Sequence, residues 1–364
     1  MKNKIIISLL LSFCFLSFLH AQNKVPHPVD SSERYGLYLE KAELAYDSAK
    51  FEEAIVLVEK AKDSRKAEID YNLYVLDEAL KPAAVQKTGD SIRNVLLILK
   101  ERNSNNAIDL INRTLIQYGE EKFHNSISEL YNFYKSLYEY PEADFLMGKL
   151  FFLEGDYKLA NKYYMNALEN YEVLDIKETK FDILYNLAEL AQITNEPEKL
   201  EKTLLLITAE ESDNINMNMV EKSYFSTKDT DRFFSLYRNN KYFSLKAYIL
   251  LADFYLNKNE YDKALNASLN AVLTSFSIIE STLKDRDYDY KYSTVQKAIM
   301  NSVKFSDVAE WAENNEVWKG FYQFAQISKI KNKNIFFESI NTTLYLWCPD
   351  DYWKELAFIA LKNQ

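Results

Sequence analysis

The sequence predicts an all-α protein built from paired helices. Glycine and proline are scarce, with six of each in 364 residues, whereas sheets joined by tight turns need these residues for their special backbone angles. Apolar residues recur three or four positions apart, as in residues 42–49 and 146–153, which is the spacing of one helix face. A third observation, an internal repeat, indicates how the helices are arranged.

Three segments share one pattern of small and aromatic residues. In each, a small residue is followed by an aromatic residue nine positions later, then by an alanine three further on and a second alanine seven after that. The segments begin at Ala42, Gly148 and Ala252. Small side chains allow two crossing helices to approach closely. The pattern therefore predicts three helix pairs of similar construction.

This pattern resembles the tetratricopeptide repeat (TPR) family, whose helix pairs recur about every 34 residues. The resemblance implies a right-handed α-solenoid of antiparallel helix pairs over residues 34–364. The best copies lie near residues 35–68, 141–174 and 245–278. Because these copies start about three repeat lengths apart, we expect degenerate copies in the intervals and after the last copy. They are placed near residues 88–121, 181–210 and 318–349.

The last segment, residues 350–364, is predicted to cap the solenoid. It begins with two aspartates that can cap a helix, and it places Trp353, Leu356, Ala357 and Ala360 on one face. A terminal helix of this kind covers the last repeat and exposes a polar face to water. Two polar stretches, residues 210–226 and 284–292, are expected to be connecting loops.

The first residues predict export. Lys2 and Lys4 precede an apolar run from Ile5 to Leu19, and the small residue Ala21 follows, as in a secretory signal peptide over residues 1–21. The run is somewhat shorter than the roughly 20 residues of a membrane span, although an uncleaved anchor stays open as an alternative. Phe13 precedes Cys14 where a lipoprotein signal has a small residue, so no lipid anchor is expected.

The protein is therefore expected to be periplasmic or secreted, with a flexible tail at residues 22–33 and no membrane insertion after signal removal. Removing the two lysines of the signal changes the formal net charge from −10 to −12. Acidic and basic residues alternate along the chain, which argues against a nucleic-acid partner because such partners need a basic face. Cys348 is then the only cysteine, so no internal disulfide is expected.

The sequence offers no recognisable catalytic motif. His27 and His124 are far apart and do not form a zinc motif, and neither a phosphate-binding loop nor a nucleophile elbow is present. We therefore predict no catalytic residue, no metal and no cofactor. The leading hypothesis is a protein–protein interaction or scaffold protein. An enzyme acting on sugar or peptide polymers of the cell envelope and a self-associating structural component remain as alternatives.

The TPR resemblance also implies a concave surface lined by the first helix of each pair. The candidate contact residues are Phe145, Lys149 and Phe152 in the second copy, Tyr185 and Glu189 in a degenerate copy, and Ile249 and Asp253 in the third copy. Some TPR modules hold a terminal carboxylate with lysine and asparagine at two of these positions, which here hold other residues. A mixed apolar and charged surface suits an amphipathic helix or an extended protein segment as the partner.

Overall fold

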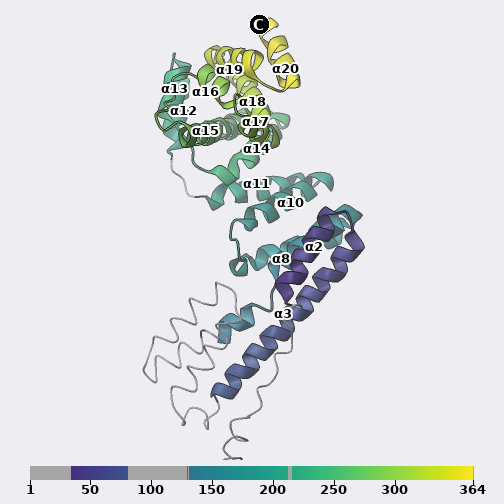
Figure 1. Cartoon of the computed structure of the whole chain (residues 1–364). Coiled ribbons are helices and arrows are strands. Elements are labelled where there is room, and N and C mark those ends of the chain that lie inside the picture. Colours follow the sequence, from purple (N-terminus) through teal and green to yellow (C-terminus); the bar gives the residue numbers. More distant parts are fainter. Residues whose placement is uncertain (1–33, 81–128, 130, 212–214, 364) are drawn as a thin grey trace, which may run out of the picture. The chain divides into compact units, whose positions relative to one another are not determined.

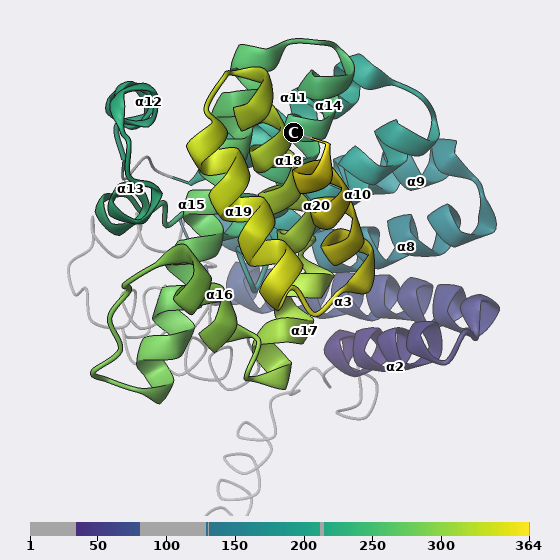
Figure 2. The same ribbon diagram turned by 90° about the horizontal axis from the view of Figure 1, so that it is seen from above.

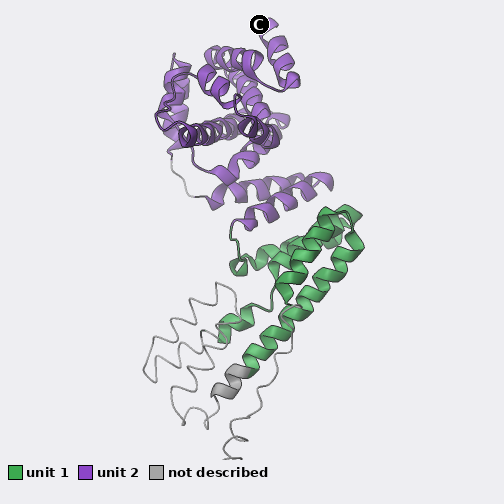
Figure 3. Cartoon of the chain, in the orientation of Figure 1, with its two compact units in different colours: residues 1–177 green, residues 178–364 purple. Residues whose placement is uncertain are grey.

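The structure, a computed structural model, describes residues 34–80, 129, 131–211 and 215–363. Every regular element in these ranges is helical, which confirms the all-α prediction (Figure 1). The chain divides into two compact units, residues 1–177 and 178–364 (Figure 3). The predicted signal peptide, the tail at residues 22–33 and the degenerate copy at residues 88–121 lie outside the described residues.

The described residues of the first unit form two helix pairs. Helix α2 (Tyr35–Asp47) pairs with α3 (Phe51–Leu80), and α8 (Pro141–Glu154) pairs with α9 (Tyr157–Glu169), which is followed by the short 3₁₀ helix η2 (Tyr171–Val173). Helix α8 also packs directly against α2 and α3, and the two pairs share one apolar core. These two pairs are therefore direct neighbours in the structure.

The second unit contains three helix pairs and further helices that cover them. The pairs are α10 (Thr179–Ile193) with α11 (Pro197–Glu210), α14 (Leu245–Asn257) with α15 (Tyr261–Arg286), and α18 (Val317–Ile330) with α19 (Asn334–Trp347). Helix α11 packs against α14, and α15 against α18. The last helix, α20 (Asp351–Lys362), lies alongside α19 (Figures 1 and 2).

Additional helices occur where the sequence predicted a loop. Residues 210–226 were expected to be a connector, but α12 (Met217–Ser226) is helical and is followed by α13 (Thr230–Leu236) and the 3₁₀ helix η3 (Tyr242–Ser244). Tyr224 of α12 is fully buried, and its ring lies 4.7 Å from that of Phe336. One apolar face is therefore enough to fold this otherwise polar stretch against α19. The second predicted connector, residues 284–292, is a loop only after α15 ends at Arg286.

Two short helices, α16 (Val295–Ser302) and α17 (Ser306–Asn314), follow that loop. Helix α16 packs against α15 and α19, and α17 packs against α18. Together with α12 and α13 they enclose a set of fully buried aromatic side chains. These are Tyr224, Phe233, Phe234, Phe276, Trp318, Phe321, Phe324, Phe336 and Phe337. Part of the aromatic excess of the sequence is thus core packing in the second unit.

The small residues of the repeat pattern lie where paired helices cross. Ala42, Ala160, Ala167, Ala252 and Ala264 are completely buried. At Gly148, an added Cβ would lie 2.4 Å from Cδ1 of Tyr164 on the paired helix, which leaves no room for any side chain. The close helix approach inferred from the sequence is therefore confirmed at these positions.

A common turn joins the two helices of each pair among the described residues. In every case the residue two positions before the second helix has a positive φ, between 56° and 80°. The next residue donates its backbone N–H to a carbonyl five positions earlier, over 2.7–3.0 Å. This is the Schellman arrangement that closes helix C-termini. The positive-φ residues are Ala49, Gly155, Asn195, Asn259 and Asn332.

Candidate binding surfaces on the helix pairs

Three predicted contact residues lie together on α8 in the first unit. Phe145, Lys149 and Phe152 are all half-buried. The ammonium group of Lys149 lies 5.0 Å from the centre of the Phe145 ring and 4.8 Å from that of Tyr46 on α2, so it is held by cation–π attraction from two helices. The structure thus brings these side chains into one partly exposed surface of aromatic and cationic character, spanning α2 and α8.

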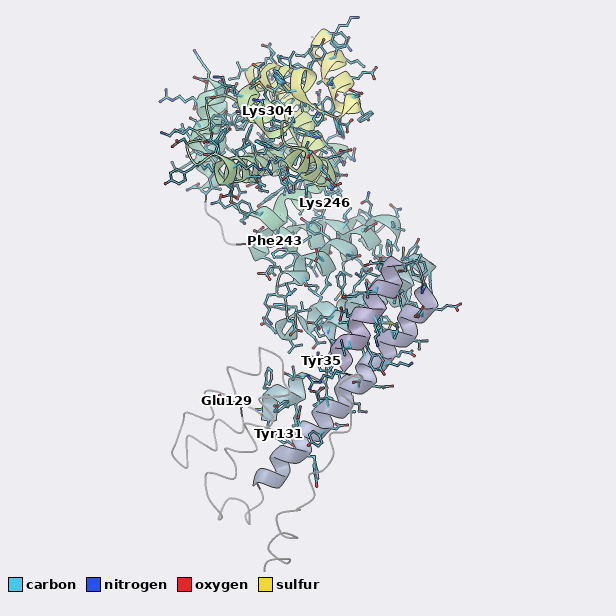
Figure 4. All side chains as sticks on the ribbon, viewed as in Figure 1. Tyr35, Glu129, Tyr131, Phe243, Lys246 and Lys304 are labelled. Atoms are coloured by element: carbon cyan, nitrogen blue, oxygen red, sulfur yellow. The ribbon has the colours of Figure 1, made fainter. Side chains whose placement is uncertain are left out.

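Tyr185 on α10 has a different position from the one predicted. Its hydroxyl donates a hydrogen bond to the carbonyl of Phe243 over 2.6 Å and accepts one from the backbone N–H of Ala247 over 3.1 Å. Burial raises the pKa of Tyr185 above its usual range. The Phe243 ring also stacks on Phe181 at 4.6 Å, on the segment that enters α14 (Figure 4). Tyr185 therefore joins α10 to the start of α14.

Ile249 is a core residue and not a surface contact, which corrects its prediction. It is 0% exposed, and an added Cβ on Gly320 of α18 would lie 3.0 Å from its Cγ1 atom. The later helix α18 covers this side of α14, and the sequence pattern did not reveal that contact. Ile249 is therefore enclosed between α14 and α18.

The two remaining candidates in the second unit are acidic and accessible. Glu189 is exposed on α10. Asp253 on α14 accepts a hydrogen bond from Nε2 of Gln323 over 2.8 Å and pairs with Lys319 at 3.0 Å. Both of these partners belong to α18, so Asp253 ties two helices together while part of its side chain remains exposed. Of these two carboxylates, Asp253 is therefore paired with a cation, and Glu189 is the more exposed candidate.

A polar cluster around Arg65 in the first unit was not predicted. The guanidinium of Arg65 lies 4.1 Å from the centre of the Tyr140 ring and 5.2 Å from that of Tyr35, the first residue of α2 (Figure 4). It donates hydrogen bonds to the carbonyls of Leu137 and Glu139 over 2.8 and 3.3 Å. Arg65 is only 6% exposed. This side chain fastens the segment before α8 onto α3.

Two cavities flank Arg65. One, of about 330 Å³, lies against α3, α8 and α9; the other, of about 380 Å³, lies against the ends of α2 and η2. The first is lined by Lys62, Asp63, Arg65, Lys66, Tyr138, Glu139, Tyr140, Asp144, Tyr163 and Asn166. Lys62 pairs with Asp144 and also lies over the Tyr163 ring at 5.1 Å. The Tyr163 ring also stacks on Phe151 at 5.4 Å, so it contacts both a cation and a second ring.

Glu142 lies beside this cluster at the start of α8. Its Oε1 atom accepts a hydrogen bond from the backbone N–H of Asp175 over 2.8 Å, while its Oε2 atom is buried with no hydrogen-bond partner in the structure. Burial raises the pKa of the Glu142 carboxyl, and the negative charge of Asp175 acts in the same direction. The bond holds the segment that follows η2 against α8.

The described part of the chain contains no group of histidine, cysteine and carboxylate side chains arranged to hold a metal ion. Cys348 is 1% exposed, and burial raises the pKa of its thiol to about 12, so it is protonated and inert at neutral pH. None of the helices in the described ranges has the length and apolarity needed to cross a bilayer.

The sequence is similar to that of a known protein. An uncharacterized protein of Treponema pallidum (strain Nichols) is 25% identical over 296 residues, which cover 79% of this chain and 79% of the relative. No protein-family model matches the sequence. The similarity extends over most of both chains.

Proposed function

We propose that this protein is a non-catalytic interaction or scaffold protein on the periplasmic or envelope side of the cell. Its helix pairs are TPR-like repeats of a right-handed α-solenoid, and it binds a peptide or protein segment on the exposed faces of the first helices of its pairs. The observation that carries this proposal is the common turn joining the helices of each described pair, because stacked helix pairs of one construction are how a solenoid builds an extended binding surface.

The α8 surface is the main candidate for this contact. Phe145, Lys149 and Phe152 are half-buried, and they are held in place by rings from α2 and α9. Side chains that are already ordered lose little conformational entropy when a partner binds. A surface with aromatic rings and one cation suits a segment that carries apolar side chains and a carboxylate.

A site-specific photo-cross-linking experiment tests this proposal. A photoreactive phenylalanine analogue replaces Phe152 in the full chain, and the same analogue at Val56 of α3, which is 50% exposed, serves as control. We expect covalent adducts with a protein or peptide at position 152 and none at position 56. Equal adduct yields at both positions would contradict a specific surface on α8, and adducts with a glycan would favour the envelope-enzyme alternative.

A charge reversal sharpens the same test. Lys149→Glu removes the cation between Tyr46 and Phe145 and should reduce the adduct yield at position 152 by about tenfold, the effect of losing about 1.4 kcal/mol of binding. Lys158→Glu, at an exposed lysine of α9, is the matched control and should leave the yield unchanged. An equal loss from both substitutions would indicate nonspecific electrostatic attraction.

The proposed export is tested separately by the mass of the protein isolated from cells. Cleavage after Ala21 leaves Gln22 as the first residue. Intact-mass measurement of the protein from the envelope fraction should match residues 22–364. A protein that retains Met1 in the membrane fraction would instead support the uncleaved anchor.

A further inference from the structure

The last helix, α20, exposes apolar side chains on part of its outer surface. Its inner face behaves as predicted, with Ala357 fully buried and Trp353, Leu356 and Ala360 half-buried. The outer surface, however, is not uniformly polar. Tyr352 is 62%, Phe358 45% and Ile359 44% exposed. The expectation that α20 shows only a polar face to water is therefore wrong.

Part of this exposed surface has the spacing of a helix–helix seam. Tyr352, Leu356, Ile359 and Asn363 follow one another at steps of four, three and four residues, which is how side chains recur along the contact between two packed helices. Leu356 is half-buried, so it lies at the border between this seam and the inner face. Helix α20 contacts α18 and α19 on its other side. Among the described helices, α18 and α19 are those that make extensive contact with α20.

The charges at the two ends of α20 are opposite and accessible. Asp351 begins the helix and lies 3.4 Å from the ammonium of Lys354 one turn on, but its side chain stays 96% exposed. Lys362 ends the helix and is also exposed. If two copies of α20 lay antiparallel, each Asp351 would face Lys362 of the other copy. The helix dipoles would also oppose each other favourably. The charges at the two ends of the helix are thus complementary under a two-fold rotation.

We propose that two copies of this protein associate through α20, packed antiparallel about a two-fold axis near Glu355 and Leu356. Tyr352 of each copy packs against Ile359 of the other, and two Asp351–Lys362 pairs close the ends. Two-fold contacts of this kind use the same patch on both subunits. This contact is separate from the α8 surface of the proposed function.

The size of the contact sets its strength. Helix α20 has 12 residues, so it buries less than the roughly 800 Å² per partner of a standard stable interface. A dimer held by this contact alone is therefore expected to be reversible, and its dissociation is sought at micromolar concentrations.

Sedimentation equilibrium of residues 22–364 tests the proposal. The wild-type chain should show a monomer–dimer equilibrium over micromolar concentrations. Ile359→Asp places a charge in the seam and should weaken dimerisation by more than tenfold. Leu44→Asp, at a residue of α2 that is 61% exposed, is the matched control and should change nothing. Circular dichroism verifies that both variants stay folded.

A charge exchange tests the antiparallel geometry. Asp351→Lys alone and Lys362→Asp alone each place like charges together twice and should weaken the dimer about threefold to tenfold, given the usual strength of exposed pairs. The double variant restores opposite charges and should restore the affinity. Failure of the double variant to recover would overturn the antiparallel arrangement.

Disulfide trapping locates the axis. Glu355→Cys should form a covalent dimer on mild oxidation, because the two copies of this residue lie near the axis, whereas Cys348 is buried and does not react. Thr342→Cys, at an exposed position of α19, should remain monomeric under the same oxidation. A wild-type chain that stays monomeric up to about 100 μM, well above the micromolar range in which such a contact acts, overturns the proposal.

Discussion

Ala49 is the least suitable residue for the turn that it occupies. Its φ is 56°, in the left-handed region, where a Cβ atom costs roughly 1–2 kcal/mol. The equivalent positions of the other four described pairs hold Gly155, Asn195, Asn259 and Asn332, residue types that tolerate this region. The shared turn is therefore maintained in the first pair against an unfavourable local conformation.

Replacing Ala49 by glycine should stabilise the first unit. The substitution removes the energetic cost of a Cβ atom in the left-handed region. It also gives the unfolded chain more conformational freedom, which lowers the free energy of unfolding by about 0.4–1 kcal/mol. A net gain of about 0.5–1 kcal/mol in the free energy of unfolding is expected, measured by urea denaturation. Asn195→Gly changes the equivalent turn of the second unit and should have a smaller effect. If Ala49→Gly is destabilising, then Ala49 does not adopt a positive φ in solution.

Gly148 illustrates the opposite constraint, imposed by a neighbouring helix. An added Cβ would lie 2.4 and 2.5 Å from Cδ1 and Cε1 of Tyr164, so the tyrosine ring or the helix must move. Overpacking of this kind costs about 1–3 kcal/mol and outweighs the helix propensity gained by alanine, which is about 1 kcal/mol. Gly148→Ala should therefore lower the free energy of unfolding by about 1–2 kcal/mol.

Two comparisons identify Tyr164 as the cause. Gly36→Ala in α2 meets no atom within 4 Å and should be neutral or slightly stabilising. In a Tyr164→Leu background, Gly148→Ala should lose most of its effect, because the clashing ring atoms are absent. Equal destabilisation in both backgrounds would show that the strain lies elsewhere.

At the scale of secondary-structure elements, the Glu142 side chain holds the segment after η2 against α8. Burial and the nearby Asp175 raise the pKa of its carboxyl, although Arg65 opposes the shift. The folded state therefore binds this proton more readily than the unfolded state, so ionisation of Glu142 weakens folding. This loss of folding free energy is complete at pH values above the raised pKa. It disappears as the pH falls below the ordinary pKa of 4.5.

Glu142→Gln should accordingly stabilise the first unit at pH 7. Glutamine keeps an oxygen that accepts the hydrogen bond from Asp175 and removes the buried charge. The difference in free energy of unfolding between the two proteins should shrink as pH falls from 7 to 4, measured by denaturant titration at several pH values. A difference independent of pH would show that ionisation of Glu142 is not responsible.

The helix pairs could be predicted from sequence because their signal is local. Ala42, Gly148 and Ala252 mark crossings between helices that are joined by a three-residue or shorter turn, so one stretch of sequence contains both partners. Contacts between distant segments carry no such signal. The packing of α8 on α3 and the covering of Ile249 by Gly320 depend on which elements meet, and a spacing pattern cannot show this.

The candidate surface was predicted less well than the helices. Phe145, Lys149 and Phe152 do share a face, since residues three or four apart on one helix must do so. Ile249 was assigned to the surface by repeat position, but α18 buries it. Tyr185 is half-buried, and its hydroxyl bonds to the segment that enters α14. Arg65 was not predicted, because a charged residue on a helix is normally solvent-exposed. Its contacts with the Tyr140 ring and two backbone carbonyls, which make its burial possible, come from a distant part of the sequence.

At the scale of the whole molecule, each unit has its own apolar core. In the first unit, small residues such as Ala42 and Ala54 pack with Leu146 and Leu150. In the second, the packing is dominated by aromatic rings around Phe336, which lies within 6 Å of the ring centres of Tyr224, Phe233, Phe234 and Phe324. Stability is therefore set by different residues in the two parts of the chain.

This separation predicts a local response to loss of the Phe336 ring. Phe336→Ala leaves a cavity among the surrounding rings and should cost about 3–5 kcal/mol. Hydrogen–deuterium exchange of the full chain should show faster exchange of amides in α13, α18 and α19, since the most protected amides report the stability of their own cooperative unit. Amides of α2 and α8 should exchange as in the wild type, because their core contains none of these rings. Faster exchange throughout both units would instead show that the chain unfolds as one cooperative body.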